Sequence, residues 1–212
     1  LSLFFSSFYI KDFRIDASSD SLVSQSDEDF KYFSYYQDLF PTKSSLVIAI
    51  KGNKKIDKLL LTEIEKISKK LSSLPEVYSV FNINKAPILL LNKTNLLDLA
   101  SDNYETIIDT NLEIKDVLNE FAKSPIYSDQ IINKNKNITS IIIFLNENSK
   151  AIDLKENKIF YLSQGKYYKI KTEIDNERNE LIKKIRNIII NSNQNFTYYL
   201  GGVEMISSDV IS

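Results

Sequence analysis

The chain contains no cysteine and no histidine, and it has only four glycines. These absences exclude disulfides, thiolate nucleophiles, Cys/His zinc sites and any catalytic triad that uses an imidazole. Four glycines are too few for phosphate-cradling loops, and the Walker A, dinucleotide, nucleophile-elbow and zincin motifs are all absent. We therefore expect no enzyme activity, no catalytic residue and no cofactor.

Carboxylates are the remaining metal ligands, and the sequence gathers several of them in one region. Asp98, Asp102, Glu105 and Asp109 can be read as a calcium cluster or as a solvated helical surface. Because the D-x-[DN]-x-[DN]-G loop spacing is missing, the solvated surface is the favoured interpretation. We expect no bound metal.

The chain also lacks an excess of positive or negative charge. The 212 residues include 27 Lys and Arg against 28 Asp and Glu, and the sequence pI is about 5.7. No global basic field exists that would attract nucleic acid, so we expect no nucleic-acid partner. With 43% hydrophobic residues, the chain is long enough for one large or two small domains with a real core.

Hydrophobic periodicity predicts four strands and two helices. The predicted strands are 45–51, 77–84, 138–145 and 196–201. Each predicted helix has one apolar face. In helix 56–74 that face consists of Ile56, Leu60, Ile64, Ile67 and Leu71, and in helix 174–191 it consists of Leu181, Ile185 and Ile188. The order βαββαβ predicts an α+β fold of the ferredoxin-like, split-βαβ type.

Two inserts interrupt this plan. Residues 92–128 predict a helical insert, which leads into a hairpin with strands at 129–133 and 138–145. A second hairpin is predicted in 150–172, turning at Gln164-Gly165. We expect a membrane-proximal segment at 1–44, a main domain at 45–202 and an exit segment at 203–212.

The first segment also contains a predicted helix with an aromatic stripe. Ser26 and Asp29 resemble a capping box at its start. Aromatic residues then recur at helical spacing until Pro41 ends the helix. We interpret this stripe as core packing. It consists of Phe30, Phe33, Tyr36 and Phe40.

Lysines surround the apolar face of the predicted helix 56–74. They form either a phosphate or lipid-headgroup patch or an ordinary solvated helix surface, and the second interpretation is favoured. These lysines are Lys54, Lys55, Lys58, Lys66, Lys69 and Lys70.

Both ends of the chain are apolar around a polar body. The first ten residues, LSLFFSSFYI, are too few to span a bilayer, which takes about 20 apolar residues, and they lack the features of a signal peptide. We expect an insert between two membrane helices, with 1–10 and 203–212 close together at its membrane-facing end. The expected membrane-proximal residues are Phe4, Phe5, Phe8, Gly201, Gly202 and Met205.

Five stretches, in order, resemble the first extracytoplasmic loop of RND (resistance–nodulation–division) superfamily exporters, in the MMPL-like or hopanoid-exporter-like branch. They are FRIDASSDSLVSQSDEDFKYFSYYQDLF, LVIAIKG with the helix through LSSLPEVYSVFNI, FAKSPIYSDQIINKNKNITSIIIFL, NERNELIKKIRNIII and YLGGVEMISSDVIS. The resemblance covers nearly the whole chain. It departs from the family at 150–172 and at Glu204, where many relatives have proline.

The resemblance implies a periplasmic porter domain of a proton-driven exporter in the bacterial inner membrane. Lipid-like or hydrophobic compounds would be its substrates. Its partners would be its own transmembrane helices and a second periplasmic loop. A homo-oligomer is compatible with this arrangement. The proton-relay residues would lie outside this chain. A stand-alone ferredoxin-like module that binds a ligand or lipid, or acts as a sensor, is the alternative.

A substrate path, if one exists, is expected over the sheet face opposite the two helices or between this domain and its second-half partner. The candidate residues are Phe81, Ile83 and Tyr199. The competing interpretation is that these three side chains pack beneath the inserts.

Overall fold

A computed structural model of the protein describes residues 27–40, 43–52 and 54–211. Lys43–Met205 forms one compact unit. The other described residues belong to a second unit.

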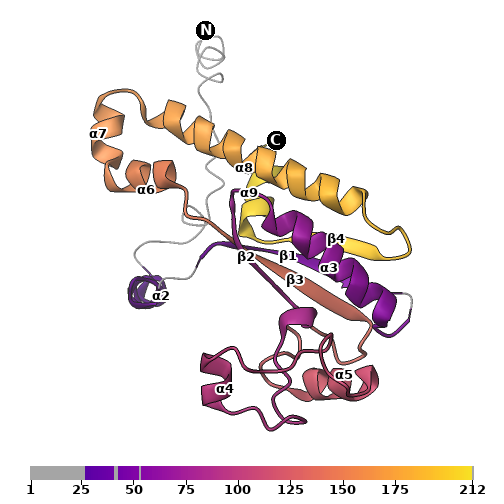
Figure 1. Ribbon diagram of the computed structural model, residues 1–212. Coiled ribbons are helices and arrows are strands. Elements are labelled where there is room, and N and C mark those ends of the chain that lie inside the picture. Colours follow the sequence, from indigo (N-terminus) through magenta and orange to yellow (C-terminus); the bar gives the residue numbers. More distant parts are fainter. Residues whose placement is uncertain (1–26, 41–42, 53, 212) are drawn as a thin grey trace. The chain divides into compact units, whose positions relative to one another are not determined.

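The compact unit is built on a four-stranded antiparallel sheet. Its strands are β1 (Ser45–Lys51), β2 (Val77–Asn82), β3 (Ile138–Leu145) and β4 (Thr197–Gly201), arranged in the order β2-β3-β1-β4 (Figure 1). With helices α3 (Lys58–Ser72) and α8 (Tyr167–Ile190), the connectivity is βαββαβ. The predicted ferredoxin-like α+β class is confirmed, and each predicted strand overlaps an observed one.

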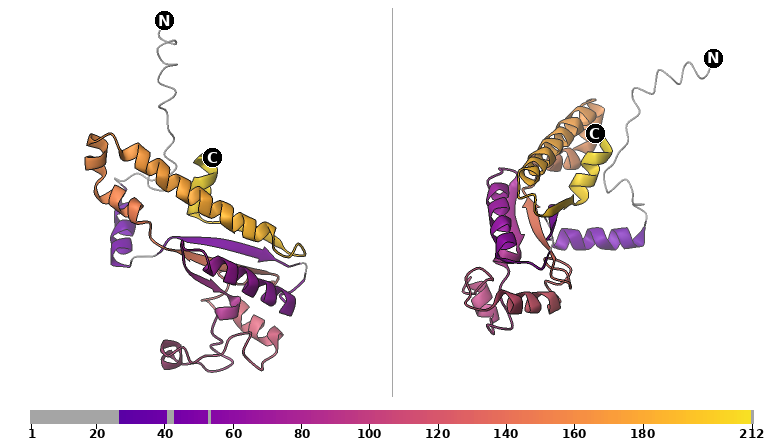
Figure 2. Two further views of the ribbon diagram at one scale, coloured as in Figure 1. Left: turned by 45° about the horizontal axis from the view of Figure 1, so that its top comes forward. Right: turned by 90° about the vertical axis from the view of Figure 1, so that its right-hand side faces the viewer.

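Both helices lie side by side over one face of the sheet (Figure 2). Leu46, Ile48 and Ile50 of β1 alternate with half-buried residues and are fully buried. Ile64 of α3 and Ile185 of α8 are also fully buried. All the predicted inward-facing residues of the two helices are buried except Ile188, which is half-buried and packs against the core.

Local signals in the sequence explain where α3 begins and ends. The Asp57 carboxylate accepts a hydrogen bond from the Leu60 backbone N–H at 2.9 Å, which satisfies one of the free donors of the first turn. The helix stops at Ser72, and Pro75 follows three residues later. The apolar face then repeats at helical spacing against the sheet, so burial stabilises a helix that propensity alone would leave marginal.

The insert between β2 and β3 is helical, as predicted. It contains the 3₁₀ turn η3 (Ile83–Lys85) and the helices α4 (Leu96–Ala100) and α5 (Ile114–Lys123). The strand predicted at 129–133 is wrong, because this segment makes only isolated bridges, including Ile132 to Thr139. Ile131 and Ile132 are buried without a ladder.

The predicted hairpin at 150–172 is also wrong, since this stretch is helical. It forms α6 (Ser149–Glu156), α7 (Lys158–Ser163) and the start of α8. Gly165, with φ of +64°, ends α7. The N–H of Gly165 donates to the Leu162 carbonyl, and the N–H of Lys166 donates to the Tyr161 carbonyl. This is a Schellman helix stop, so the glycine that suggested a hairpin turn instead separates two helices.

The second unit includes α2 (Glu28–Leu39) and most of α9 (Val203–Ile211). Asp27 caps α2 by accepting the Asp29 N–H at 2.9 Å. The predicted capping residue, Ser26, lies outside the described residues, as does Pro41. Tyr36 and Phe40 are exposed, so for these two members of the aromatic stripe the core interpretation is wrong. Among the described helices, none combines the length and hydrophobicity that a membrane span requires.

Candidate functional site: the sheet face opposite the helices

The face of the sheet opposite α3 and α8 is largely apolar. Side chains alternate along strands, so the residues between the buried ones point to this face. One row across the sheet pairs Phe81 of β2 with Ile142 of β3, and Ile142 with Val47 of β1. A second row pairs Ser140 of β3 with Ala49 of β1, and Ala49 with Tyr199 of β4.

Most of the apolar residues on this face are half-buried. Val47, Ala49, Phe81, Ile142 and Phe144 all have intermediate exposure. Tyr199, on the edge strand, is 58% exposed. The result is a mainly aliphatic and aromatic surface across neighbouring strands, interrupted by the buried Ser140, and we name it the strand face. Such a surface suits an apolar ligand or a second protein surface.

Two of the three candidate substrate-path residues lie on the strand face. Phe81 is on β2 and Tyr199 is on β4, so β3 and β1 separate them. At the usual strand spacing the two lie roughly 14 Å apart across the sheet. One small ligand cannot contact both, although an elongated one can.

The third candidate, Ile83, is misplaced by the sequence prediction. It begins η3 and is fully buried in the core, so it cannot line a surface path. The strand ends one residue earlier, at Asn82, whose side chain accepts the Asn84 N–H at 2.8 Å. That local hydrogen bond replaces strand pairing with a turn and redirects Ile83 inward.

Sequence reasoning missed Val47, Ile142 and Phe144 as members of the strand face. β1 and β3 are nearly continuous apolar runs, so no polar alternation shows which residues face away from the helices. The strand register supplies that information, and it comes only from the folded sheet.

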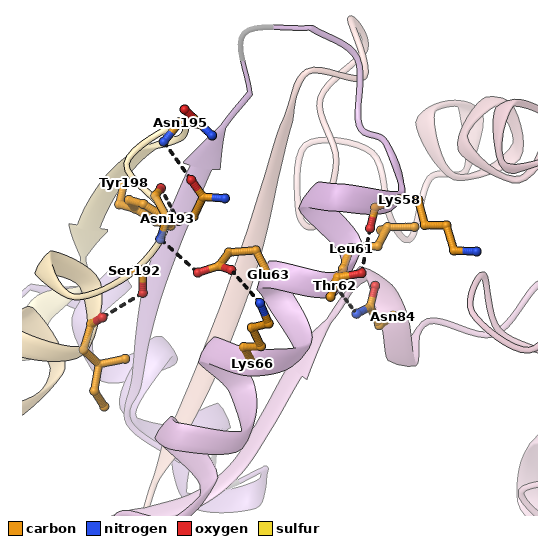
Figure 3. A network of polar contacts seen from close by, with 11 residues as sticks. Lys58, Leu61, Thr62, Glu63, Lys66, Asn84, Ser192, Asn193, Asn195 and Tyr198 are labelled. Carbon is orange, nitrogen blue, oxygen red and sulfur yellow. Dashed lines mark hydrogen bonds and ion pairs between the residues drawn. The ribbon is translucent and has the colours of Figure 1, made fainter.

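A polar network fixes the edge strand β4 beside α3 (Figure 3). The Glu63 carboxylate accepts the Asn193 N–H at 3.0 Å, and Lys66 lies 3.8 Å from the other Glu63 oxygen. The Tyr198 hydroxyl donates to the Asn193 carbonyl at 3.1 Å. Burial, followed by the Glu63 charge, raises the pKa of Tyr198 to about 12. These bonds give the N–H and the carbonyl of Asn193 a partner each, and they hold β4 in register.

A groove of about 840 Å³ lies between α6, α8 and the adjoining strand ends. Ion pairs cross it. Lys184 is 2.7 Å from Glu76, and the hydrogen bond between them lowers the pKa of the Glu76 carboxyl. Lys150 is 2.5 Å from Glu177, and this contact raises the lysine pKa and lowers the glutamate pKa. One pair joins α6 to α8, and the other joins α8 to the residue before β2.

Glu204 has a structural role. Its carboxylate lies 2.5 Å from the Arg178 guanidinium, which also contacts Asp175 at 3.1 Å. The pair ties the start of α9 to α8. A proline at 204 would lack this ion pair.

A smaller hollow of about 290 Å³ lies between the start of α3, α5 and the turn before β3. Its floor is apolar and its rim carries lysines, so we name it the lysine-rimmed hollow. It is lined by Lys55, Ile56, Asp57, Lys58, Ile114, Lys115, Leu118 and Lys136.

The residues expected near a membrane fall into two groups. Phe4, Phe5 and Phe8 lie outside the described residues, as does the whole of 1–10. Gly201 ends β4, Gly202 follows with φ of +127°, and Met205 lies half-buried in α9.

Within the described parts of the chain, no group of three or more potential metal-ligating side chains comes together. A scan against models of protein families and a search of curated proteins both find no match for this chain.

Proposed function

We propose that the chain is the periplasmic porter domain of a proton-driven RND-type exporter of the bacterial inner membrane, without enzymatic activity. Its substrates would be lipid-like or hydrophobic. The observation that best supports this proposal is the position of the two ends of the compact unit. The chain enters the sheet at the start of β1 and leaves it at the end of β4, and these strands are antiparallel neighbours.

The two ends are close together at one end of the sheet. Val47 pairs with Gly201, and a side chain added at Gly202 would lie 2.9 Å from the Ser45 carbonyl oxygen. A domain inserted between two membrane helices must return both ends to the same bilayer surface. The fold meets that requirement without a long connection, and a rigid sheet covered by helices can rock as one body about such a pair of tethers.

The strand face supplies a surface that fits the proposed substrates. Its apolar residues lie away from α3 and α8, where they can contact a hydrophobic compound or the second periplasmic domain. Phe81 and Tyr199 remain our candidates on this path, and Ile83 is withdrawn because it is buried. We add Ile142 and Phe144, which lie between Phe81 and β1.

Reading the gene on both sides of the segment that encodes this chain tests the proposal directly. We expect an apolar run of about 20 residues shortly after Ser212 and another ending near the first residues. A gene that encodes neither run would overturn the exporter proposal. It would favour the alternative, a stand-alone ferredoxin-like module that binds a ligand or lipid.

A second test uses the absence of cysteine from the chain. The substitution Lys69→Cys on the exposed side of α3 places a single thiol in the compact unit. In the full-length protein, depleted of any cysteines in the rest of the gene product, a membrane-impermeant maleimide should label it in cells with a permeabilised outer membrane. Labelling only after the inner membrane is lysed would place the domain on the other side.

A further inference from the structure

Four of the lysines around α3 fall into two pairs with different surroundings, which the sequence does not distinguish. Lys66 and Lys69 lie near acidic partners on their own helix, Glu63 at 3.8 Å and Glu65 at 3.5 Å. Lys55 and Lys58 have no ion pair with any described residue, and both line the lysine-rimmed hollow. The solvated-surface interpretation fits the first group and leaves the second unexplained.

Folding brings two more lysines to the same hollow from distant parts of the sequence. Lys115 comes from α5, and Lys136 comes from the turn before β3. One carboxylate, Asp57, lines the hollow with these four cations, and it already accepts the Leu60 N–H at 2.9 Å. The local charge is therefore strongly positive, although the whole chain has a net charge of −1.

Lys136 is the best positioned of the four. It is half-buried, and its ammonium donates to the Asn119 side-chain oxygen at 2.5 Å. No described carboxylate forms an ion pair with it. An ammonium carries three donors, so two remain for a ligand. A partly desolvated cation with no counter-ion favours an anion that enters the hollow.

The floor of the hollow selects a second property of the ligand. Ile56 and Leu118 are buried beneath it, and half-buried Ile114 forms one side. A bare inorganic anion would leave this apolar floor uncovered. The volume of about 290 Å³ is at the lower end of the range for small-molecule sites, so the hollow suits a short chain and not a large ring system.

We propose that the lysine-rimmed hollow binds a single-chain amphipathic anion. Its phosphate, sulfate or carboxylate head contacts Lys136 with Lys58 and Lys115, and its short apolar body lies over Ile56, Ile114 and Leu118. The ligand binds as a monomer from solution. This inference does not depend on the exporter proposal, because it uses only the compact unit and its charges.

Titration of the 212-residue chain with octyl phosphate, kept below its micelle concentration, tests the site. Calorimetry should give saturable binding of one ligand per chain. Backbone NMR shifts should concentrate at 55–58, 114–118 and 136. Octanol lacks the charge and inorganic phosphate lacks the chain, so each should bind at least about tenfold more weakly.

Single substitutions test whether the lysines of the hollow bind the ligand. Lys136→Gln and Lys115→Gln should each raise the dissociation constant about tenfold, because each removes a charge-assisted contact. Lys69→Gln is the matched control on α3, and it should leave binding unchanged. Lys115 is exposed on α5, so its variant keeps the test valid if Lys136→Gln fails to fold.

Several results would overturn the proposal. They are the absence of saturable octyl phosphate binding, equal binding of inorganic phosphate, and an equal loss in Lys69→Gln. Vesicles containing phosphatidylglycerol provide the last comparison. If the protein binds them while octyl phosphate monomers do not bind, the lysines act as a general surface charge and the hollow is not a site.

Discussion

At the scale of single residues, two glycines with positive φ play different roles. Gly202 has φ of +127°, and an added Cβ would lie 2.9 Å from the Ser45 carbonyl oxygen and 3.2 Å from the Leu46 Cα. Gly165 has φ of +64°, and an added Cβ would meet nothing within 4 Å. The first position excludes a side chain by both conformation and space, and the second by conformation alone.

Alanine substitutions at these two glycines should therefore differ in cost. Gly165→Ala should lower the free energy of unfolding by about 1 kcal/mol, the cost of a left-handed alanine. Gly202→Ala should cost more, because backbone strain of about 1–3 kcal/mol adds to the close contact with β1. Urea denaturation of the two variants measures the difference. Equal costs would mean that the Gly202 contact is not tight.

Core truncation is the second prediction at this scale. Ile64→Ala and Ile185→Ala should each lower the free energy of unfolding by about 2–5 kcal/mol, because both side chains are fully buried between the helices and the sheet. Leu59→Ala is the control on α3, where Leu59 is 54% exposed, and it should cost less than about 0.5 kcal/mol. A negligible cost at both isoleucines would contradict the helix-on-sheet packing.

Two tyrosines should make the protein sensitive to alkali. Burial is the main cause that raises the pKa of both Tyr127 and Tyr198 from 10.0 to about 12. Between those values the unfolded chain has lost phenol protons that the folded chain retains. The free energy of unfolding should therefore be unaffected by these groups below pH 10 and fall as pH rises from 10 to 12.

Phenylalanine variants test whether the two tyrosines cause this fall in the free energy of unfolding at alkaline pH. Tyr198→Phe and Tyr127→Phe should each reduce the drop in the free energy of unfolding over that pH interval, measured by urea denaturation. At neutral pH, each substitution should also lower the free energy of unfolding by about 1 kcal/mol. The reason is the loss of one hydrogen bond, from Tyr198 to the Asn193 carbonyl or from Tyr127 to the Pro87 carbonyl. Tyr199→Phe, on the exposed strand face, is the control. An unchanged drop in both buried-site variants would contradict the assignment.

At the scale of helices and strands, α6 and α7 are weakly anchored. Leu154 is the single buried residue of α6, and α7 has none. Ile159, at 84%, and Phe160, at 58%, are exposed instead. Ion pairs such as Lys150 to Glu177 join α6 and α7, together called the arm, to α8. Ion pairs that are this exposed contribute little to stability.

Amide hydrogen exchange should therefore separate the arm from the sheet. Amides of Ser149–Ser163 should exchange through local opening, much faster than those of β1 and β3, which require global unfolding. Exchange measured by mass spectrometry on peptides from both regions tests this. Comparable protection in the arm and in β3 would show that α6 and α7 are part of the cooperative core.

The sequence could predict elements whose pattern is long and tied to burial. The periodic face from Ile56 to Leu71 and the apolar runs of β1 and β3 are of this kind, and all three match the structure. The segment 150–172 could not be assigned in this way. Its helices are short, and Gly165 fits both a hairpin turn and a Schellman stop, so only the hydrogen bonds to Tyr161 and Leu162 decide.

The candidate site was only partly accessible from the sequence, for a related reason. Phe81 and Tyr199 were assigned to the strand face from strand alternation, and the register agrees. The assignment of Ile83 to this face was wrong, because the end of β2 depends on the Asn82 side chain, which forms the next turn. The lysine-rimmed hollow joins residues far apart in the chain, such as Lys58 and Lys136, and no local pattern indicates that contact.

At the scale of the whole molecule, the exporter proposal predicts a role for the strand face. In the full-length protein, Tyr199→Ser should impair tolerance of hydrophobic compounds in a host that depends on this gene, because it removes an exposed aromatic surface from the proposed path. Leu59→Ser is exposed on α3 and should have no effect. Protein abundance must be matched. Unchanged tolerance across a compound panel would remove Tyr199 from the path.

The adjacent ends of β1 and β4 also determine how the domain would respond to tension. A pull that separates Lys43 from Met205 acts across the β1–β4 ladder, beginning at the pair Val47 and Gly201. The hydrogen bonds of that ladder would then break one after another instead of sharing the load, so little force is needed. β4 is an edge strand, and β1 is the one strand with which it pairs. The seam between these two strands is thus the mechanically soft part of the domain, and β2, β3 and β1 would stay joined while it peels.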